Sequence, residues 1–461
     1  MKGFIIAGIK SGSGKTTITL GILAALFKKG ITVSVFKVGP DFIDPGHHSH
    51  IIKKPSRNID GWMLSRDYNY RCFALNSANC DVAVVEGVMG LFDGYDGKSE
   101  DGSTAQIAKW LNLPVVLIVD AKSMARSVAA IIKGFEEFDK DLKFAGVIFN
   151  NVASERHLNY LKDSLAGNVN MPFIGGIAYD DKISIPERHL GLVTSEDNPL
   201  SAETINNLSY IIEKNILIER LLNILPDINV ITPCTLDLIS PKVRIGVAKD
   251  RAFCFYYQDN IDFLNLFGGE IVYFSPISDC SLPEHLDGIY LGGGYPELFL
   301  EELSKNKSLL NQIKKKSDEG IPIYAECGGF MYLCNSICEK DGKGYEMAGC
   351  FPFDIKMLPR LKALGYREIT LLKDTIIGKR GSKIRGHEFH YSEIIKNNGE
   401  FETVYNVSTK ANINDIFEGY QISRTIGSYI HLHFGSCPDS VKTFIDYCIL
   451  YKKEMRKNNE T

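Results

Sequence analysis

Nearly continuous apolar runs, rich in β-branched residues, alternate with longer helical patterns in both halves of the chain. Strands that are apolar on both faces are typical of a parallel sheet covered by helices on both sides. In the first half we expect strands at 3–8, 32–39, 81–87, 114–121 and 144–151, with helices at 17–30 and 127–138. In the second half we expect strands at 243–248, 269–274, 286–294 and 321–326, a helix at 296–320, shorter β-like pieces after Gly344, and a closing helix at 440–455. The sequence therefore predicts an α/β protein, with a doubly wound parallel sheet in its first half and a second α/β domain in its second half.

The periodicity is lost around residues 225–242, a stretch that contains three prolines. A chain of 461 residues is also too long for one ordinary hydrophobic core. We therefore expect an N-terminal domain at 1–225, a linker at 226–242 and a C-terminal domain at 243–461.

The composition is that of a soluble globular protein, with 44% hydrophobic and 23% charged residues. A net charge of -4 offers no electrostatic reason to bind nucleic acid or an anionic membrane. No apolar run reaches the length of a membrane helix, and the N-terminal stretch "FIIAG" has no small-residue cleavage site after it. The 11 cysteines include no C-x-x-C pair, so neither a zinc ribbon nor a disulfide framework is indicated. These features predict a cytoplasmic protein.

A glycine-rich loop, "GIKSGSGKTT", follows the first expected strand and opens the first expected helix. Glycines let backbone N–H groups surround phosphates, a lysine reaches the terminal phosphates, and a hydroxyl at the helix start can bind Mg²⁺. The first glycine, Gly8, stands one residue earlier than in the usual phosphate loop, and a loop with one extra residue still forms the cradle. The loop predicts an ATP site made by Gly12, Ser13, Gly14, Lys15, Thr16 and Thr17.

Charged side chains follow two further strands, where a doubly wound sheet binds its ligands. The stretch "KVGPDFIDPGHH" offers Lys37, Asp41, Asp44 and His47, and the stretch "VVEGVMGLFDG" offers Glu86 and Asp93. Carboxylates at these positions can hold Mg²⁺ or orient a carboxylate substrate. Neighbouring histidines in "HHSH" (47–50) diverge, so we expect them to contact phosphate or substrate rather than a metal.

In "IPIYAECGGFMYL" a buried strand turns at Cys327 into an amphipathic helix. This order of strand, nucleophile, glycine and helix exposes a nucleophile above a sheet, and the helix N-terminus is expected to lower the thiol pKa. The N–H of Gly328 can donate to an oxyanion, and the turn "LGGGYPE" offers Gly293 or Gly294 as the second donor. A buried structural cysteine is the alternative, and the flanking glycines count against it.

Two histidines in "GSYIHLHFGS" (427–436) lie on one face if the stretch is a strand. A metal pair, a catalytic base with a neighbour, and packing are all compatible with that spacing. A thiol that attacks an amide needs a base that is normally distant in the sequence, and His431 meets this requirement. His387 and His390, in "RGHEFHYS", are expected to contact substrate instead.

These motifs together resemble the cobyrinic acid a,c-diamide synthase family over nearly the whole chain. "AGIKSGSGKTT", "KVGPDFIDPGHH" and "VEGVMGLFDG" are similar to its ATP-binding domain, which is related to dethiobiotin synthetase and has a P-loop NTPase-like fold. "LGGGYPE", "YAECGGFMYL", "GHEFHYS" and "SYIHLHF" are similar to its class I glutamine amidotransferase domain. The resemblance implies ATP- and glutamine-dependent amidation of the a and c acetate groups of a cobyrinate-type tetrapyrrole, in cobalamin biosynthesis, through acyl phosphates.

The resemblance also assigns roles to individual residues. It implies catalytic roles for Asp41, Asp44, Glu86, Asp93, Cys327, His431 and His433, Mg²⁺ ligation by Thr16, Asp44 and Glu86, and nucleotide contacts from Lys37 and from Asn150 or Asn151.

One position departs from the class I pattern. That pattern commonly ends in G-V-Q-F-H-P-E, in which the Glu orients the His, and here His431 takes the place of the base while His433 takes that of the Glu. A histidine cannot supply the negative charge that stabilises an imidazolium. Either another carboxylate serves, for which Glu388 is a candidate, or the Cys–His pair works without one.

Other functions remain open at this stage. The same chemistry on nickel sirohydrochlorin or hydrogenobyrinic acid fits equally well, and cobyric acid synthase fits less well. In a different class, the chain would be a P-loop switch protein with an inactive amidotransferase-like domain, since Lys10 resembles the second lysine of such loops. An oligomer is compatible with the sequence.

Overall fold

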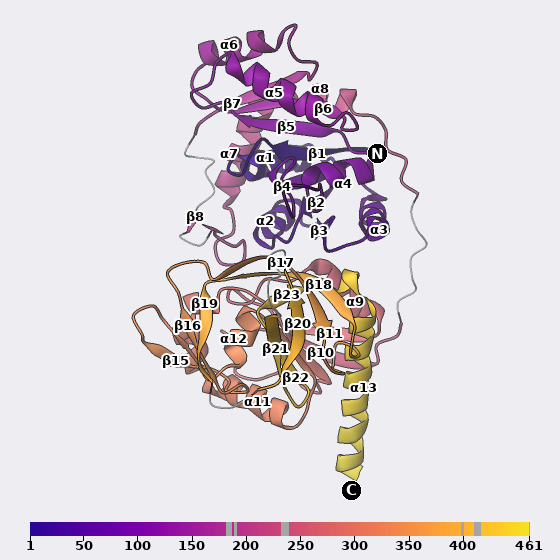
Figure 1. Ribbon diagram of the computed structural model, residues 1–461, viewed down its shortest axis with the longest axis vertical. Helices are drawn as coiled ribbons and strands as arrows, with labels where there is room; N and C mark the ends of the chain where they lie inside the picture. Colours follow the sequence, from indigo (N-terminus) through magenta and orange to yellow (C-terminus); the bar gives the residue numbers. More distant parts are fainter. Residues whose placement is uncertain (181–186, 189–190, 232–238, 398–400, 410–415, 461) are drawn as a thin grey trace. The chain divides into compact units, whose positions relative to one another are not determined.

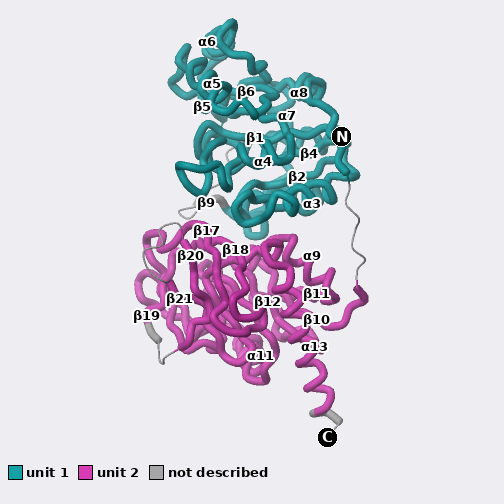
Figure 2. Tube along the Cα trace, turned by 45° about the vertical axis from the view of Figure 1, so that its right-hand side comes forward, with its two compact units in different colours: residues 1–235 teal, residues 236–461 magenta. Residues whose placement is uncertain are grey.

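The computed structural model describes residues 1–180, 187–188, 191–231, 239–397, 401–409 and 416–460 (Figure 1). The chain divides into two compact units, unit 1 at Met1–Thr235 and unit 2 at Leu236–Thr461 (Figure 2). Each unit is described by itself.

The described part of unit 1 is built on a seven-stranded sheet in the order β3-β2-β4-β1-β5-β6-β7, in which all neighbouring strands are parallel. The strands are β1 (Lys2–Gly8), β2 (Val33–Val38), β3 (Arg57–Ile59), β4 (Val82–Gly90), β5 (Val115–Asp120), β6 (Phe144–Val152) and β7 (Phe173–Ala178). A short antiparallel pair, β8 (Glu187–Arg188) and β9 (Gly191–Leu192), stands apart from this sheet.

Helices cover both faces of the unit 1 sheet (Figure 1). They are α1 (Lys15–Lys28), α2 (Ile43–Ile52), α3 (Arg66–Ser77), α4 (Thr104–Leu111), α5 (Ser127–Phe138), α6 (Glu155–Leu165), α7 (Ala202–Asn215) and α8 (Ile218–Ile224). Successive strand residues alternate between two buried clusters, so that Phe4 and Ile6 pack with α1 and α7, whereas Ile5 and Ala7 pack with α3, α4, α5 and α6. Because both faces are buried, the strands are continuously apolar, as the sequence predicted.

The first residues of the predicted linker belong to unit 1. The N–H of Ile228 donates to the carbonyl of Met1 at 2.9 Å, and Ile228 and Val230 pack against the core of that unit. The division between the units falls at residues 235 and 236, inside a stretch that lies outside the described residues.

The described part of unit 2 contains a ten-stranded mixed sheet in the order β11-β10-β12-β13-β22-β21-β20-β17-β18-β23. Its strands are β10 (Val243–Ala248), β11 (Gly269–Phe274), β12 (Gly288–Leu291), β13 (Ile323–Glu326), β17 (Ala363–Leu371), β18 (Lys383–His390), β20 (Thr403–Ser408), β21 (Ile416–Ile422), β22 (Thr425–Ser428) and β23 (Ile430–Leu432). The pairings from β11 to β22 are parallel, and the remaining pairings are antiparallel.

A second sheet and a set of helices complete unit 2. The sheet has the order β15-β14-β16-β19 and consists of β14 (Ser336–Cys338), β15 (Gly344–Glu346), β16 (Phe353–Met357) and β19 (Ser392–Asn397). The helices are α9 (Gln258–Leu266), the 3₁₀ turn η2 (Pro296–Leu298), α10 (Leu300–Lys305), α11 (Lys307–Asp318), α12 (Gly328–Leu333), the 3₁₀ turn η3 (Phe434–Ser436) and α13 (Asp439–Glu460). The predicted two-part α/β fold class is confirmed.

Two predicted elements are interrupted. The helix expected at 296–320 is divided into η2, α10 and α11, because Asn306 accepts the N–H of Leu309 and so starts a new helix. The stretch 427–436 is not one strand, because the N–H of Tyr429 donates to Glu418 at 2.8 Å between β22 and β23. Among the described residues, no helix combines the length and apolar character needed to cross a bilayer.

Phe330 provides a test of the unit 2 core. Its buried ring stacks on Tyr420 at 5.5 Å and meets Phe351 edge-on at 5.6 Å. Phe330→Ala should lower the free energy of unfolding by about 3–5 kcal/mol, because it leaves a cavity among rings that cannot collapse onto it. Phe417→Ala is the matched control, because the Phe417 ring lies in the same unit and is 53% exposed. This variant should change the free energy of unfolding by less than about 0.5 kcal/mol. Urea unfolding followed by circular dichroism measures both, and equal midpoints would contradict the packing described.

Candidate functional site

The glycine-rich loop joins β1 to α1 and adopts backbone angles that favour glycine. Gly12 has φ 72° and Gly14 has φ 92°, both in the left-handed region. A Cβ at Gly14 would lie 2.1 Å from Nδ2 of Asn150, which donates to the carbonyl of Ser13 at 3.1 Å. The Ser13 hydroxyl donates in turn to the carbonyl of Lys10 at 2.8 Å. The structure thus places Asn150, from the end of β6, directly against the loop.

The first residues of α1 carry the loop's lysine and hydroxyls. The ammonium of Lys15 donates to the carbonyl of Met89 at 2.5 Å, and burial together with Lys37 lowers the pKa of Lys15 to about 8. The Thr16 hydroxyl donates to Glu86 at 2.7 Å, and Thr17 is half-buried beside it. Lys15 and Thr16 therefore meet the strand that supplies Glu86.

A buried group of charges lies next to Thr16, and we call Lys37, Asp44, Glu86 and His48 the lysine–carboxylate cluster. The Lys37 ammonium donates to Asp44 at 2.5 Å and to Glu86 at 2.9 Å. Nε2 of His48 bonds to the other oxygen of Glu86 at 2.7 Å. Burial alone would raise the pKa of Glu86, yet Lys37 and His48 hold it below its ordinary value. Burial and the charge of Asp41 raise the pKa of Asp44.

The two other predicted carboxylates shape the backbone around this cluster. Asp41 accepts the N–H groups of Ile43 and Asp44 at 2.8 and 3.1 Å, at the start of α2, and its second oxygen is 3.8 Å from the Lys37 ammonium. Asp93 accepts the N–H of Gly90 at 2.9 Å. Both carboxylates thus stabilise turns at the carboxyl ends of β2 and β4.

The histidines of the 47–50 stretch have separate partners. His47 bonds to the carbonyl of Val193 at 2.8 Å, and His50 bonds to that of Leu200 at 3.1 Å. His48, which the sequence analysis did not single out, is the one that contacts Glu86. Adjacent histidines on a helix point about 100° apart, so the sequence alone could not choose among them.

Asp120 is a second residue that sequence reasoning missed. It ends β5, accepts from Nδ2 of Asn151 at 2.9 Å, and lies 3.5 Å from the Lys10 ammonium. The sequence feature that could have identified Asp120 is its position at the carboxyl end of a strand, where sheets of this kind bind their ligands. Lys10 is thereby paired with a carboxylate of its own unit.

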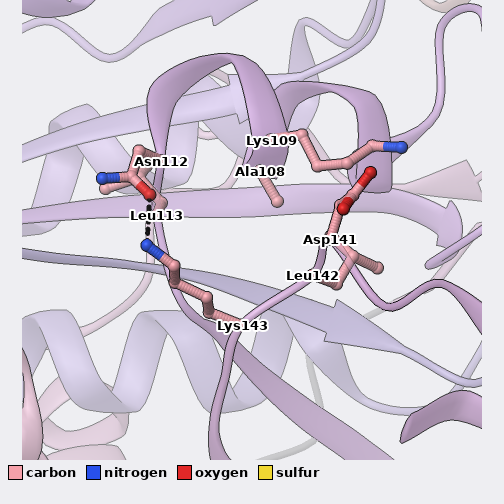
Figure 3. Close-up of a pocket in the computed structure, with 7 residues that line it drawn as sticks. All are labelled: Ala108, Lys109, Asn112, Leu113, Asp141, Leu142 and Lys143. Atoms are coloured by element: carbon pink, nitrogen blue, oxygen red, sulfur yellow. Dashed lines mark hydrogen bonds between the residues drawn. The ribbon is translucent and has the colours of Figure 1, made fainter. Parts of the chain in front are cut away.

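A hollow on the surface of unit 1 is lined by the end of α4 and by residues that precede β5 and β6 (Figure 3). It has a volume of about 210 Å³ and is lined by Ala108, Lys109, Asn112, Leu113, Asp141, Leu142 and Lys143. Its residues precede β5 and β6, whereas the loop follows the carboxyl end of β1. Since ligands of doubly wound sheets bind at the carboxyl ends of the strands, this hollow is not the nucleotide site.

In unit 2, the turn from β13 into α12 has the geometry of a nucleophile elbow, and we call Glu326, Cys327 and Gly328 the cysteine elbow. Cys327 has φ 44° and ψ -104°, a strained conformation for a residue with a side chain. Its N–H donates to the carbonyl of Ser428 at 2.7 Å, and its sulfur lies 3.8 Å from the carbonyl oxygen of Phe389.

The prediction that the helix N-terminus lowers the pKa of the Cys327 thiol is wrong. Burial, and after it the neighbouring carboxylate of Glu297, raises the thiol pKa above its usual value, although the N–H of Gly328 acts in the opposite direction. The helix α12 spans only Gly328–Leu333, so its terminus does not outweigh burial. The thiol is therefore neutral and needs a base.

Two of the three predicted oxyanion donors adjoin each other. A Cβ at Gly328 would lie 3.1 Å from the nitrogen of Gly294. Gly293 instead exchanges hydrogen bonds with Phe255, its N–H donating at 3.3 Å. A Cβ at Gly293 would also lie 2.3 Å from Cε1 of His431. The geometry favours Gly294 with Gly328 as donors, and Gly293 as the residue that makes room for the His431 ring.

His431 and His433 lie in one buried aromatic group. The His431 ring stacks on His387 of the neighbouring strand at 4.9 Å, and burial lowers the pKa of His431 to about 3. The His433 ring lies 4.5 Å from that of Tyr257, whose hydroxyl is hydrogen-bonded to Nδ1 of His387 at 2.8 Å. Nδ1 of His433 accepts the N–H of Gly435 at 3.1 Å. Both rings are thus neutral near pH 7, as a general base must be.

The carboxylate within 4 Å of His431 is Glu326 and not Glu388. Nδ1 of His431 is 3.9 Å from Oε2 of Glu326. Glu388 accepts from Nε of Arg367 at 2.6 Å and from Nε2 of His390 at 2.8 Å. The charge of Glu388 nevertheless raises the pKa of His431 against the effect of burial. The suggestion that Glu388 replaces the missing carboxylate therefore stays a prediction, beside the closer Glu326.

Unit 1 thus carries a phosphate loop on a parallel sheet, and unit 2 carries a cysteine elbow with a buried histidine. These features define a protein that joins a nucleotide-binding domain to a glutamine amidotransferase domain. Family models agree: residues 4–193 match the CobQ/CobB/MinD/ParA nucleotide binding domain, and residues 244–438 match the CobB/CobQ-like glutamine amidotransferase domain. ATP is the ligand that the first match implies.

Full-length relatives make the assignment more specific. The chain is 43% identical over 449 residues to the cobyrinate a,c-diamide synthase of Syntrophotalea carbinolica, covering 96% of this chain and 98% of the relative. It is 40% identical over 454 residues to that of Priestia megaterium, covering 98% of both, and 41% identical over 461 residues to that of Methanosarcina barkeri, covering 93% and 92%. The chain belongs to the cobyrinate a,c-diamide synthase family, and the resemblance predicted from the sequence is confirmed.

Because Gly293 lies so close to the His431 ring, a side chain at position 293 should disturb glutamine hydrolysis. Gly293→Ala should displace the imidazole and lower the rate of glutamate release from glutamine by about 10²-fold, because small misplacements of a catalytic group are that costly. Gly344→Ala is the control, since the nearest atom to its added Cβ is the sulfur of Cys338 at 3.5 Å, and it should leave the rate unchanged. Equal rates for the two variants would show that His431 is not the base.

Proposed function

We propose that this protein is a cobyrinate a,c-diamide synthase. It uses ATP and glutamine to convert the a and c acetate carboxylates of cobyrinate into amides, in cobalamin biosynthesis. The observation that carries the proposal is the presence of both sites in one chain, the loop at Lys15 with its lysine–carboxylate cluster and the elbow at Cys327, in a family whose named relatives match nearly the full length.

The unit 1 site suits activation of a carboxylate by ATP. Loop N–H groups and Lys15 bind the phosphates, while Lys37 holds a second positive charge beside them. The substrate carboxylate attacks the γ-phosphorus, giving an acyl phosphate and ADP, and ammonia then displaces phosphate to give the amide. Asp41 and Asp93 position the loops that surround this site, and Asn150 holds the phosphate loop itself.

Mg²⁺ fits the same site. Among the described residues, no group of three or more His, Cys, Asp and Glu side chains is arranged to hold a metal ion by itself. Mg²⁺ usually takes one or two protein carboxylates and completes its shell with phosphate oxygens and water, so a full protein cage is not required. Asp44 and Glu86 both bind one buried cation, the Lys37 ammonium, and the Thr16 hydroxyl donates to both carboxylates. The oxygens of the three residues therefore lie together beside a positive charge, which supports the assignment. Bound there, Mg²⁺ would neutralise phosphate charge.

The unit 2 site suits hydrolysis of glutamine. Cys327 is the nucleophile, His431 removes its proton, and the N–H groups of Gly294 and Gly328 stabilise the oxyanion. His433, which packs on Tyr257, is assigned to the surroundings of the base. A cytoplasmic location remains the prediction from the sequence.

The decisive experiment is a mass measurement of products. The purified chain is given ATP, Mg²⁺, glutamine and, separately, cobyrinate, hydrogenobyrinate and nickel sirohydrochlorin, because each amidation replaces one hydroxyl by one amino group and shifts the mass by a fixed step. We expect a diamide from cobyrinate. If only another macrocycle gained two amide groups, that macrocycle would be the substrate in place of cobyrinate. If glutamine were not hydrolysed under any condition, the chain would instead be a P-loop switch protein.

Because glutamine hydrolysis and amidation are assigned to different sites, one reaction should be lost without the other. Cys327→Ala should abolish glutamine-dependent amidation and retain ammonia-dependent amidation, because ammonia bypasses the thiol. Cys280→Ala, at an exposed cysteine of the same unit, is the control and should retain both. Equal loss of both activities in folded Cys327→Ala would show that the two-site assignment is wrong.

A further inference from the structure

The base in a cysteine or serine site is normally oriented by a carboxylate. The position that would supply it here is His433, whose Nδ1 accepts a backbone N–H and whose ring packs on Tyr257. Glu326 lies instead with Oε2 3.9 Å from Nδ1 of His431, and the two side chains are only 1% and 2% exposed. The site therefore contains a carboxylate, supplied by a different strand, that lies close to Nδ1 of His431 but 3.9 Å away, beyond direct hydrogen-bond distance.

Glu326 is held rigidly in that place. Its Oε1 accepts from the Tyr324 hydroxyl at 2.6 Å and from the N–H of Leu432 at 3.0 Å. Its Oε2 accepts from the Tyr290 hydroxyl at 3.1 Å. Leu432 directly follows the base in the chain, and Glu326 directly precedes the nucleophile. One carboxylate thus links the strand that carries the thiol to the strand that carries the imidazole.

Two half-buried carboxylates in the same unit, Glu418 and Glu388, have different partners. Glu418 accepts from the Ser428 hydroxyl at 2.6 Å and from the N–H of Tyr429 at 2.8 Å. Glu388 is bound by Arg367 and His390. Among the described residues, neither carboxylate lies within 4 Å of a nitrogen of His431, whereas Oε2 of Glu326 lies 3.9 Å from Nδ1. The charge of Glu388 acts on the pKa of His431 from a greater distance.

We propose that Glu326 is the positioning residue of the glutaminase site, which orients His431 through Nδ1 and stabilises its protonated form. The inference rests on the proposed function, because it assumes that Cys327 and His431 hydrolyse glutamine. In the usual class I pattern, the carboxylate that orients the base stands at the position of His433. Here the residue before the nucleophile, Glu326, takes that role.

The proton follows a simple course. Nδ1–H of His431 faces Glu326, so Nε2 is free of a proton and takes the one from the Cys327 sulfur as that sulfur bonds to the amide carbon of glutamine. The imidazolium then gives this proton to the amide nitrogen, the C–N bond breaks, and ammonia leaves a glutamyl thioester. Water hydrolyses the thioester to glutamate and regenerates the thiol. Burial raises the pKa of Glu326 to about 7, with Tyr324 and Leu432 opposing the rise, so ionisation is within reach near neutral pH.

The test compares four variants of the full chain, Glu326→Gln, Glu326→Asp, Glu418→Gln and Glu388→Gln, with ATP, Mg²⁺ and cobyrinate present. Glu326→Gln should lower kcat for glutamate release by about 10³-fold to 10⁴-fold, since neutralising the orienting carboxylate of a triad costs about 10⁴-fold. KM for glutamine should change by less than about threefold, because the interaction develops only as the imidazole gains charge. Glu326→Asp keeps the charge and should recover at least about tenfold of the loss. Glu418→Gln, at a half-buried carboxylate that bonds to Ser428 and Tyr429, is the matched control and should leave kcat within about threefold.

Several outcomes would overturn the inference. These are an unchanged kcat in Glu326→Gln, an equal fall in Glu326→Gln and Glu418→Gln without recovery in Glu326→Asp, or a fall confined to Glu388→Gln. If the unaltered chain hydrolyses no glutamine, the proposed function fails instead, so the two failures are distinguishable. Urea unfolding followed by circular dichroism, measured in parallel, reports whether unit 2 of each variant is folded, and ammonia-dependent amidation reports the state of unit 1.

A measurement on the unaltered chain tests the inference even if the variants do not fold. Nitrogen-15 NMR of histidine-labelled protein distinguishes the two neutral imidazole tautomers, and the His431 signals are those missing from His431→Ala. We expect a proton on Nδ1 and none on Nε2. The opposite tautomer would overturn the inference, because Nε2 could then accept no proton from Cys327.

Discussion

The contact of Lys37 with Asp44 and Glu86 is the interaction on which the unit 1 site depends. Two carboxylates cannot be buried side by side without a compensating charge, since each unpaired ion costs several kcal/mol. The Lys37 ammonium, 4% exposed, lies 2.5 Å from one and 2.9 Å from the other. The Thr16 hydroxyl donates to the Glu86 oxygen that Lys37 contacts, and His48 bonds to the other oxygen. The cluster therefore connects β2, α2, β4 and the phosphate loop, and gives the site a prearranged set of charges for phosphates and a metal ion.

The unit 2 site differs from the unit 1 site, because its reactive groups are buried in their neutral forms and not as paired charges. Burial raises the pKa of the Cys327 thiol and lowers that of His431 to about 3, so both are neutral near pH 7. Proton transfer between them creates two charges in a site that disfavours both. The reaction therefore depends on fixed partners for each charge: backbone N–H groups at the elbow for the negative one, and Glu326 for the positive one.

Much of the fold followed from apolar periodicity, and the failures have local causes. The strands at 243–248 and 269–274 and the helix at 127–138 have the predicted bounds, because both faces of a strand or one face of a helix are packed. Asn306 divides the predicted helix at 296–320 through its own side-chain hydrogen bond, which apolar spacing does not record. Cys327 was found because glycines flank it. Glu326 was missed because its partners, Leu432 and His431, lie more than a hundred residues away.

The magnitude of the Glu326 contribution can be argued from distance. Opposite charges about 4 Å apart interact by about 4 kcal/mol at an effective dielectric constant of about 20, which is appropriate to many buried protein sites. That energy corresponds to roughly a thousandfold in rate if it is present only when His431 is protonated. The interaction is small while His431 is neutral, so it stabilises the transition state and the thiolate–imidazolium pair rather than bound glutamine. A carboxylate placed one residue before the nucleophile can thus have the same physical effect as one placed two residues after the base, because what matters is its distance from the imidazole and not its place in the sequence.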